Sequence, residues 1–184
     1  MRADTTAVRS GRHQPVRESA VESGAPHVPG IDLSTTYGFR TSSAVADSMD
    51  ALLEGDFGAP NPVYARLHNP TVAGFEEALA DLEEADGAVA FATGMAAISA
   101  VVLAAAAPRE GVRWPHVVAV RPVYGGTDHL RTSGLLGTEV DWVEPEHVGD
   151  AIRADTGLVL LETQANPTLV MTDVRAVVEQ VRDR

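Results

Sequence analysis

From residue 70 onward, the sequence alternates between short apolar runs and segments with helical periodicity, and this alternation restricts the fold more than any other feature. We predict strands at residues 88–92, 117–120, 139–143 and 158–162. The segments between and around them predict helices at residues 70–86, 94–107, 126–136, 145–153 and 173–182. Parallel strands need a crossover connection, which a helix usually supplies. We therefore expect an α/β fold on a mainly parallel sheet with both faces covered by helices.

The first predicted helix, residues 70–86, is amphipathic. Phe75, Leu79 and Leu82 recur at helical spacing, opposite pairs of glutamates that we expect to face solvent. Asn69 or Thr71 can cap this helix, because a side-chain oxygen at that position accepts a free amide of the first turn. Asp173 is the matching cap for the last predicted helix.

A stretch of 20 residues without a charge, 88–107, is long enough to cross a bilayer. It is rich in alanine, it lacks flanking aromatic residues, and Thr93-Gly94 interrupts it at a natural turn. We therefore interpret it as a buried strand, a turn and a helix that is apolar nearly all round and hence buried. The N-terminus has arginines but no apolar core of a signal peptide, so we expect a cytoplasmic protein without a membrane partner.

The composition excludes several functions. With 14 basic and 26 acidic residues the net charge is −12, which repels nucleic acid and anionic membranes. There is no cysteine, and the six histidines form no metal-binding spacing, so we expect no metal site. Every basic residue is an arginine, so chemistry that needs a side-chain amine cannot be completed by this chain alone.

The chain divides into three parts. Residues 1–30 are rich in Arg, Ser, Pro and Gly and predict a mobile arm. Residues 31–69 predict an extended segment, a short helix at 44–53 and a loop. Residues 70–184 hold the alternating pattern, which stops after a helix where another strand would follow, so we expect a truncated domain.

In an open α/β sheet, ligands bind beyond the carboxyl ends of the strands, and two segments there are candidates for a phosphate and a ring. At Gly94 and Met95, the amides of a helix start can hold a phosphate, although a plain strand–helix turn is the alternative. Tyr124 is followed by two glycines and can present its ring to a flat ligand, or simply pack at the edge of a loop.

Two further segments carry polar candidates. Asn166 precedes a proline, so its amide can reach a ligand, although an ordinary Asn-Pro turn is the alternative. Tyr64 and Arg66 lie in a loop rich in Gly, Pro and Asn. The guanidinium of an arginine can make two parallel hydrogen bonds to a phosphate. The alternative there is a solvated arginine, which is the common fate of this residue type.

These segments occur in a characteristic order: YARLHNPT, ATGMAA, VYGGT and ETQANPTL. In this order they resemble the Cys/Met-metabolism family of pyridoxal-phosphate enzymes, the trans-sulfuration group. The resemblance covers about residue 31 to the C-terminus and implies the large domain of the type I aminotransferase-like fold, an α/β/α sandwich. The family's cofactor is pyridoxal 5′-phosphate.

The resemblance also implies roles for the candidate residues. The amides of Gly94 and Met95 would hold the cofactor phosphate, and Tyr124 would stack on the pyridine ring. Asn166 would lie near that ring, with Glu162 supporting the Asn166 loop.

Tyr64 and Arg66 would reach the cofactor phosphate of a neighbouring subunit, which places residues 31–69 at a dimer interface. The family is usually a homotetramer made of two such homodimers.

The implied activity is β- or γ-elimination or γ-replacement on an amino-acid substrate of the activated homoserine, cysteine or cystathionine class. We expect a cystathionine gamma-synthase or gamma-lyase type, with O-acetylhomoserine sulfhydrylase and methionine gamma-lyase as alternatives. Gly126 stands where methionine gamma-lyases tend to carry Cys, which weighs against that member. The Schiff-base lysine of the family has no counterpart, so no catalytic residue is assigned. The alternative is an inactive fragment, or a remnant that pairs with a full-length subunit.

Overall fold

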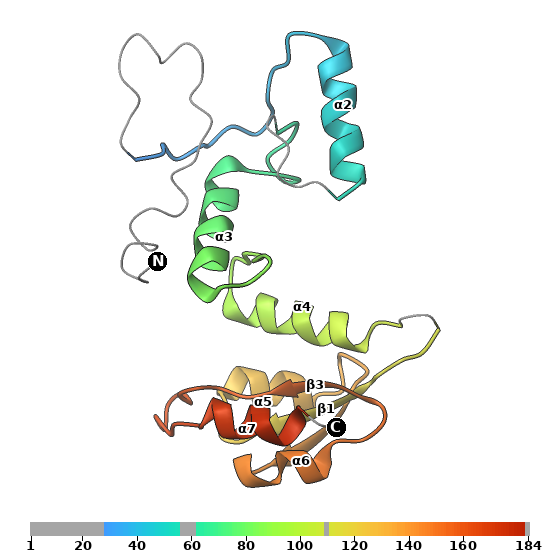
Figure 1. The fold of residues 1–184 in the computed structure, drawn as a ribbon, viewed down its shortest axis with the longest axis vertical. Helices are drawn as coiled ribbons and strands as arrows, with labels where there is room; N and C mark the ends of the chain where they lie inside the picture. The colour runs from blue at the N-terminus through green and yellow to red at the C-terminus, as the bar shows by residue number, and fades with distance from the viewer. Residues whose placement is uncertain (1–27, 56–61, 109–110, 183–184) are drawn as a thin grey trace. The chain divides into compact units, whose positions relative to one another are not determined.

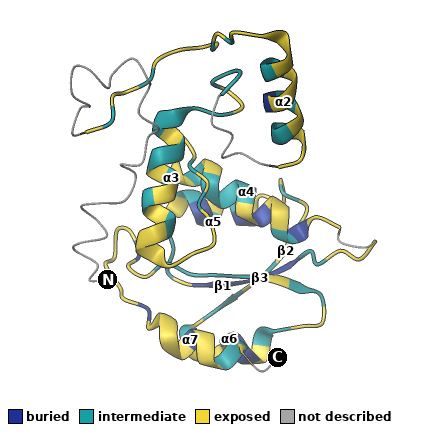
Figure 2. Cartoon of the chain, turned by 45° about the horizontal axis from the view of Figure 1, so that its top comes forward, coloured by how far each residue is buried: buried dark blue, intermediate teal, exposed yellow. Residues whose placement is uncertain are grey.

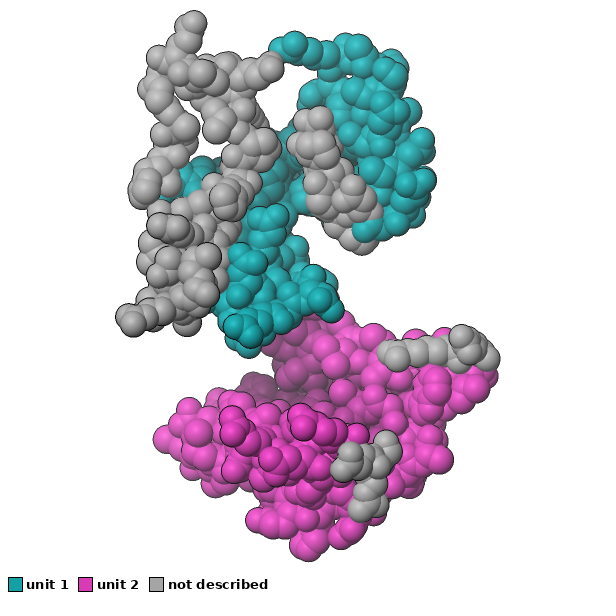
Figure 3. Space-filling model, in the orientation of Figure 1, with its two compact units in different colours: residues 1–90 teal, residues 91–184 magenta. Residues whose placement is uncertain are grey.

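The computed structural model describes residues 28–55, 62–108 and 111–182 (Figure 1). The chain forms two compact units, residues 1–90 and residues 91–184 (Figure 3). Most of the predicted mobile arm, residues 1–27, lies outside the described residues. The predicted boundaries at residues 30 and 69 stay predictions.

Two helices fall within the described residues of the N-terminal unit, α2 (Ser42–Leu53) and α3 (Pro70–Glu83). The Asn69 side chain caps α3 by accepting hydrogen bonds from the amides of Thr71 and Val72, so Asn69 rather than Thr71 is the cap. The helix ends before residue 86, as Glu84 takes a left-handed conformation with φ of 52°.

An extended segment runs alongside the loop that precedes α3. Thr36 and Tyr64 form an antiparallel bridge, and the Ala65 amide donates to the Thr35 carbonyl at 2.9 Å. The Asn69 side chain donates to the carbonyl of Asp32 at 3.2 Å. The cap of α3 therefore also anchors the extended segment.

The face of α3 that carries Phe75, Leu79 and Leu82 is open. These side chains are 57%, 37% and 43% exposed, because nothing else in the described part of the chain covers them. Glu76, expected in solvent, instead accepts a hydrogen bond from the Ala90 amide at 2.7 Å. The prediction that the glutamates only face solvent is therefore wrong for Glu76.

The predicted strand at 88–92 is also not formed. A strand needs a neighbour to satisfy its backbone groups, and none of the segments that the structure describes pairs with this one.

The C-terminal unit is built on a parallel sheet of three strands in the order β2-β1-β3. The strands are β1 (His116–Val120), β2 (Glu139–Val143) and β3 (Thr156–Leu160). All five residues of the central strand β1 are buried, as expected for a strand with neighbours on both sides and helices on both faces.

Helices cover both faces of this sheet. Helices α4 (Gly94–Ala106) and α5 (Gly125–Thr132) lie on one face, and α6 (Val148–Ala151) and α7 (Val174–Val181) on the other (Figure 2). Four buried valines pack the sheet against α6 and α7: Val118, Val120, Val148 and Val177. The predicted α/β/α sandwich with a parallel sheet is confirmed.

Two predicted helices are shorter than expected. The helix expected at 126–136 ends at Thr132, because Gly134 and Gly137 take positive φ values of 71° and 63° that reverse the chain. The helix expected at 145–153 is a 3₁₀ turn, η2 (Pro145–His147), followed by the single turn of α6.

Helix α4 packs on one side only. Val102 and Ala106 are buried, whereas Val101 and Leu103 are each 52% exposed. The expectation of all-round burial is wrong, since the described residues cover a single stripe of this apolar helix. No helix within the described ranges is long and apolar enough to cross a membrane.

Gly157 lies where the register between β1 and β3 shifts. A Cβ atom at this position would lie 2.7 Å from the Trp114 carbonyl oxygen and 3.0 Å from the Ala105 carbonyl oxygen. Backbone oxygens cannot move aside as a flexible side chain can, so this contact between β3, α4 and the segment before β1 requires glycine.

We therefore expect Gly157→Ala to destabilise the C-terminal unit by about 1–3 kcal/mol, as overpacking does in a filled core. Urea unfolding followed by tryptophan fluorescence measures the change. Gly125→Ala is the matched control, because a Cβ there meets no atom within 4 Å. Equal unfolding midpoints for the two variants would contradict the requirement for glycine.

Candidate functional site

The first turn of α4 has two amide groups without a partner. The first four N–H groups of a helix have no acceptor within it. The Thr93 hydroxyl accepts from the Ala96 amide at 3.1 Å, and the Thr93 carbonyl accepts from the Ala97 amide at 3.1 Å. The amides of Gly94 and Met95 receive no acceptor from the described residues. Together with the helix dipole they form a site suited to an anion such as a phosphate.

Tyr124 follows β1 and begins α5. Its carbonyl accepts from the Asp128 amide at 3.0 Å, and its own amide donates to Glu162 Oε1 at 2.8 Å. Tyr124 is 46% exposed, so the residue is accessible to a ligand.

Gly126 brings the Tyr124 ring and the first turn of α4 together. A Cβ at Gly126 would lie 2.5 Å from Cε1 of Tyr124 and 3.3 Å from Sδ of Met95. The ring and the methionine sulfur thus meet over the bare backbone of Gly126. The Tyr124 ring therefore lies near the side chain of Met95, whose backbone amide is one of the two open ones, and this arrangement fits a phosphorylated aromatic cofactor.

Asn166 lies in a tight loop after β3. The Ala165 amide donates to the Val170 carbonyl at 3.0 Å, and Gln164 pairs with Met171 in an antiparallel bridge. The Asn166 side chain is exposed. The role of Asn166 beside a cofactor ring stays a prediction.

Glu162 makes a contact that was not predicted, because its Oε1 accepts a hydrogen bond from the Tyr124 amide. Its support of the Asn166 loop stays a prediction. The sequence contained no signal for this pairing, because the two residues are 38 positions apart.

Tyr64 and Arg66 lie together in the N-terminal unit. The Arg66 guanidinium carbon lies 4.9 Å from the centroid of the Tyr64 ring, a cation–π contact. Arg66 is exposed and Tyr64 is partly buried. Their contact with a neighbouring subunit's cofactor stays a prediction.

A cavity of about 370 Å³ opens elsewhere, at the carboxyl ends of β1 and β2. It is lined by Arg121, Trp142, Val143, Glu144 and His147, none of which was singled out from the sequence. The Arg121 guanidinium carbon lies 4.3 Å from the Trp142 ring centroid, and Arg121 pairs with Asp128 at 2.7 Å. Because this arginine is already engaged by a ring and a carboxylate, we place the candidate site at α4 instead.

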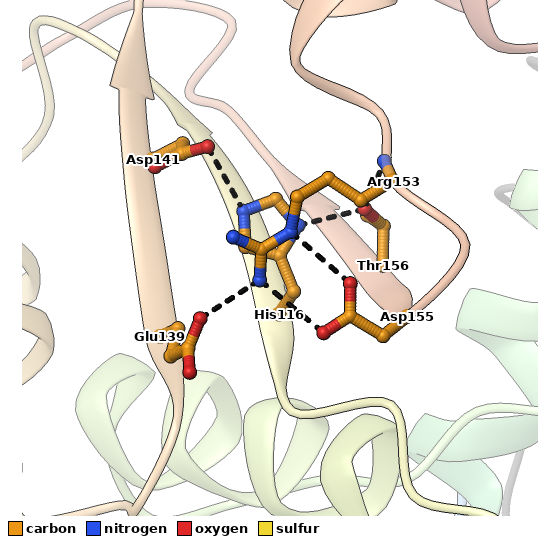
Figure 4. Close-up of polar contacts among 6 residues, drawn as sticks. All are labelled: His116, Glu139, Asp141, Arg153, Asp155 and Thr156. Atoms are coloured by element: carbon orange, nitrogen blue, oxygen red, sulfur yellow. Dashed lines mark hydrogen bonds and ion pairs between the residues drawn. The ribbon is translucent and has the colours of Figure 1, made fainter.

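A second polar cluster lies at the amino ends of the three strands (Figure 4). His116 Nδ1 is 2.7 Å from Thr156 Oγ1, and the same hydroxyl accepts from the Arg153 amide at 2.8 Å. His116 Nε2 lies 3.3 Å from Asp141 Oδ2, within ion-pair distance but without hydrogen-bond geometry. The histidine side chain is fully buried, at the opposite edge of the sheet from Tyr124, so the cluster joins strands rather than binding a ligand.

Arg153 completes this cluster by bonding to Glu139 at 2.8 Å and to Asp155 at 3.1 Å. The hydrogen bond from Arg153 holds the pKa of the exposed Asp155 carboxyl below its usual value. Because the folded state favours the ionised form of Asp155, this contact stabilises the fold at pH values above the pKa of the carboxyl in the unfolded chain. The contribution is lost as the pH falls through the lower pKa of the folded state.

The chain belongs to the Cys/Met metabolism PLP-dependent enzyme family, because the model of that family matches residues 4–184. It is 55% identical to L-methionine gamma-lyase of Streptomyces avermitilis over 174 residues, which cover 94% of this chain and 40% of that protein. It is 35% identical to the cystathionine beta-lyase MetC of Bacillus subtilis over 133 residues, 70% of this chain and 32% of that protein.

Solved structures agree with this assignment. The crystal structure of apo CalE6, a methionine gamma lyase from Micromonospora echinospora, has a TM-score of 0.71 and 30% identity. The match covers all of this chain and 44% of that one. The chain spans about two fifths of the length of the Streptomyces relative. The expected family, fold and pyridoxal-phosphate cofactor class are confirmed.

We expect Gly126→Ala to turn the Tyr124 ring away from Met95, because the new Cβ would overlap Cε1 of the ring. The ring yields rather than the fold, since its side chain is partly exposed and alanine favours the helix. ¹⁹F NMR of the chain labelled with fluorotyrosine measures the shift of the Tyr124 signal. Gly125→Ala, which meets no atom, is the control, and an unchanged signal in Gly126→Ala would refute the contact.

We expect Arg153→Gln to raise the pKa of the Asp155 carboxyl toward its ordinary value, because the guanidinium donor is lost. Carboxyl-carbon NMR titration of the folded chain measures this pKa. Arg175→Gln on α7, far along the chain, is the control and should leave Asp155 unchanged. The same Asp155 pKa in both variants would show that Arg153 is not the cause.

Proposed function

We propose that this chain is the part of a pyridoxal-phosphate enzyme of the L-methionine gamma-lyase type that binds the cofactor phosphate and ring. The observation that carries the cofactor role is the pair of open amides at Gly94 and Met95 beside the Tyr124 ring. The methionine gamma-lyase type is favoured by 55% identity over 94% of the chain, against 35% for the cystathionine beta-lyase. This identity outweighs Gly126, which weighed against a methionine gamma-lyase in the sequence analysis.

The proposed roles follow from the groups that each residue presents. The amides of Gly94 and Met95 donate to the phosphate, and the Tyr124 ring packs against the pyridine plane. Asn166 lies near the ring from the loop after β3. When bound, pyridoxal phosphate withdraws electrons from the bonds of the substrate α-carbon. These residues hold and orient the cofactor, and the substrate is an amino acid, L-methionine.

Tyr64 and Arg66 extend the proposal to a second subunit. A guanidinium can make two parallel hydrogen bonds to a phosphate, and the phenol hydroxyl adds one donor. We propose that both residues reach the phosphate bound by a neighbouring copy in a homodimer, which further assembles into a homotetramer. Arg66 is exposed and therefore accessible to such a partner.

A second candidate function rests on the absence of lysine from the sequence. Without a side-chain amine the chain cannot move a proton at the substrate α-carbon in the way a lysine would. Under this alternative the 184-residue chain is inactive alone and pairs with a longer subunit.

A chimaera separates the two candidates. This chain replaces the matching 174 residues of the Streptomyces avermitilis enzyme, and cleavage of L-methionine is measured beside the unaltered enzyme. A folded, active chimaera supports the cofactor-binding role. A folded chimaera that binds no cofactor supports the inactive alternative.

We expect Gly94→Pro to weaken binding of pyridoxal phosphate to the chain about tenfold, because one donor to a charged phosphate is lost. Proline suits the first helical position, and Thr93 before it is already extended, with φ of −147° and ψ of 152°. Equilibrium dialysis measures the affinity.

Gly94→Ala is the matched control, since it keeps the N–H and its Cβ meets nothing within 4 Å. Pyridoxal, which lacks the phosphate, should bind both variants alike. Equal affinities of the Pro and Ala variants for pyridoxal phosphate would remove this amide from the phosphate site.

A further inference from the structure

The Glu162 side chain links two loops that lie at the same edge of the sheet. Strands β1 and β3 are parallel neighbours, so the segments that follow them emerge together. Tyr124 follows β1 and Glu162 follows β3, and the Tyr124 amide donates to Glu162 Oε1 at 2.8 Å. A carboxylate acceptor makes this a charge-assisted hydrogen bond, stronger than one between neutral groups.

This hydrogen bond is one of two that hold the backbone of Tyr124. The Tyr124 carbonyl is held by the Asp128 amide, within α5. Tyr124 gives α5 no side-chain cap, so its phenol is not engaged by the helix that it begins. With both backbone groups held, the ring can move only through its own side-chain torsions.

The position of the ring depends on this fixed backbone. The ring lies over Gly126 and near Sδ of Met95, a residue of the first turn of α4 whose backbone amide is open. A shift of the Tyr124 backbone would carry the ring away from that turn. Glu162 makes no described contact with the first turn of α4, which the Thr93 side chain caps.

We infer that Glu162 is a positioning residue for the cofactor ring, acting through the Tyr124 backbone and not on the phosphate. This inference rests on the proposed cofactor role of Tyr124. It separates two contributions to binding: α4 holds the phosphate, and the Glu162–Tyr124 link aligns the ring contact.

The test measures the affinities of the 184-residue chain for pyridoxal phosphate and for inorganic phosphate. Glu162→Ala should weaken pyridoxal phosphate about threefold to tenfold, the size of one aromatic contact, and leave inorganic phosphate unchanged. Glu162→Gln keeps an acceptor oxygen and should recover part of the loss. Glu179→Ala on α7 removes a carboxylate that belongs to neither loop and should have no effect.

A double-mutant cycle distinguishes positioning from a general structural effect. In a Tyr124→Ala background, Glu162→Ala should cause no further loss, because the ring it aligns is absent. A further loss of the same size in that background would overturn the inference, as would equal weakening of inorganic phosphate.

An NMR measurement decides the link without cofactor. The Tyr124 amide signal should shift in Glu162→Ala, because its acceptor is lost, and should shift less in Glu162→Gln, which keeps an acceptor oxygen. A Tyr124 amide signal that is the same in all three chains would overturn the inference. A chain that binds neither probe counts against the proposed function, and the amide signal then reports on the Glu162 link separately.

Discussion

The parallel pairing of β1 with β2 and β3 determines almost everything else in the C-terminal unit. It buries all of β1 and places the segments that follow the strands at one edge of the sheet. Because the strands run in the same direction, residues 38 positions apart become hydrogen-bonding partners. The opposite edge is tied by the Arg153 and His116 contacts, so each edge of the sheet has its own polar linkage (Figure 4).

Much of this architecture is encoded locally. The strand predicted at 139–143 coincides with β2, and Asn69 and Asp173 cap the helices that they precede. Such features depend on neighbouring residues alone, so a pattern in the sequence predicts them. The placement of Gly94 at a helix start is of the same kind, because the side chain of Thr93, the residue before it, caps the helix.

The features that sequence reasoning missed depend on distant residues. The segment 88–92 has the composition of a strand, but a strand forms only beside another strand. The open face of α3 has the same origin, since burial depends on what packs against Phe75 and Leu79. The Glu162 contact and the stacking of Arg121 on Trp142 join segments whose proximity only the assembled sheet defines. Local patterns in the sequence predict helices and strands. Contacts between distant segments decide which strands form and which helix faces are buried.

The contact over Gly126 makes the residues at positions 95, 124 and 126 depend on one another. A side chain at 126 occupies the space where the Tyr124 ring and the Met95 sulfur now meet. A lineage that acquires a larger residue there must therefore accept a different tyrosine rotamer, a smaller residue at 95, or both. Positions 95, 124 and 126 should consequently covary among relatives, although they belong to two different helices and to the turn between a strand and a helix.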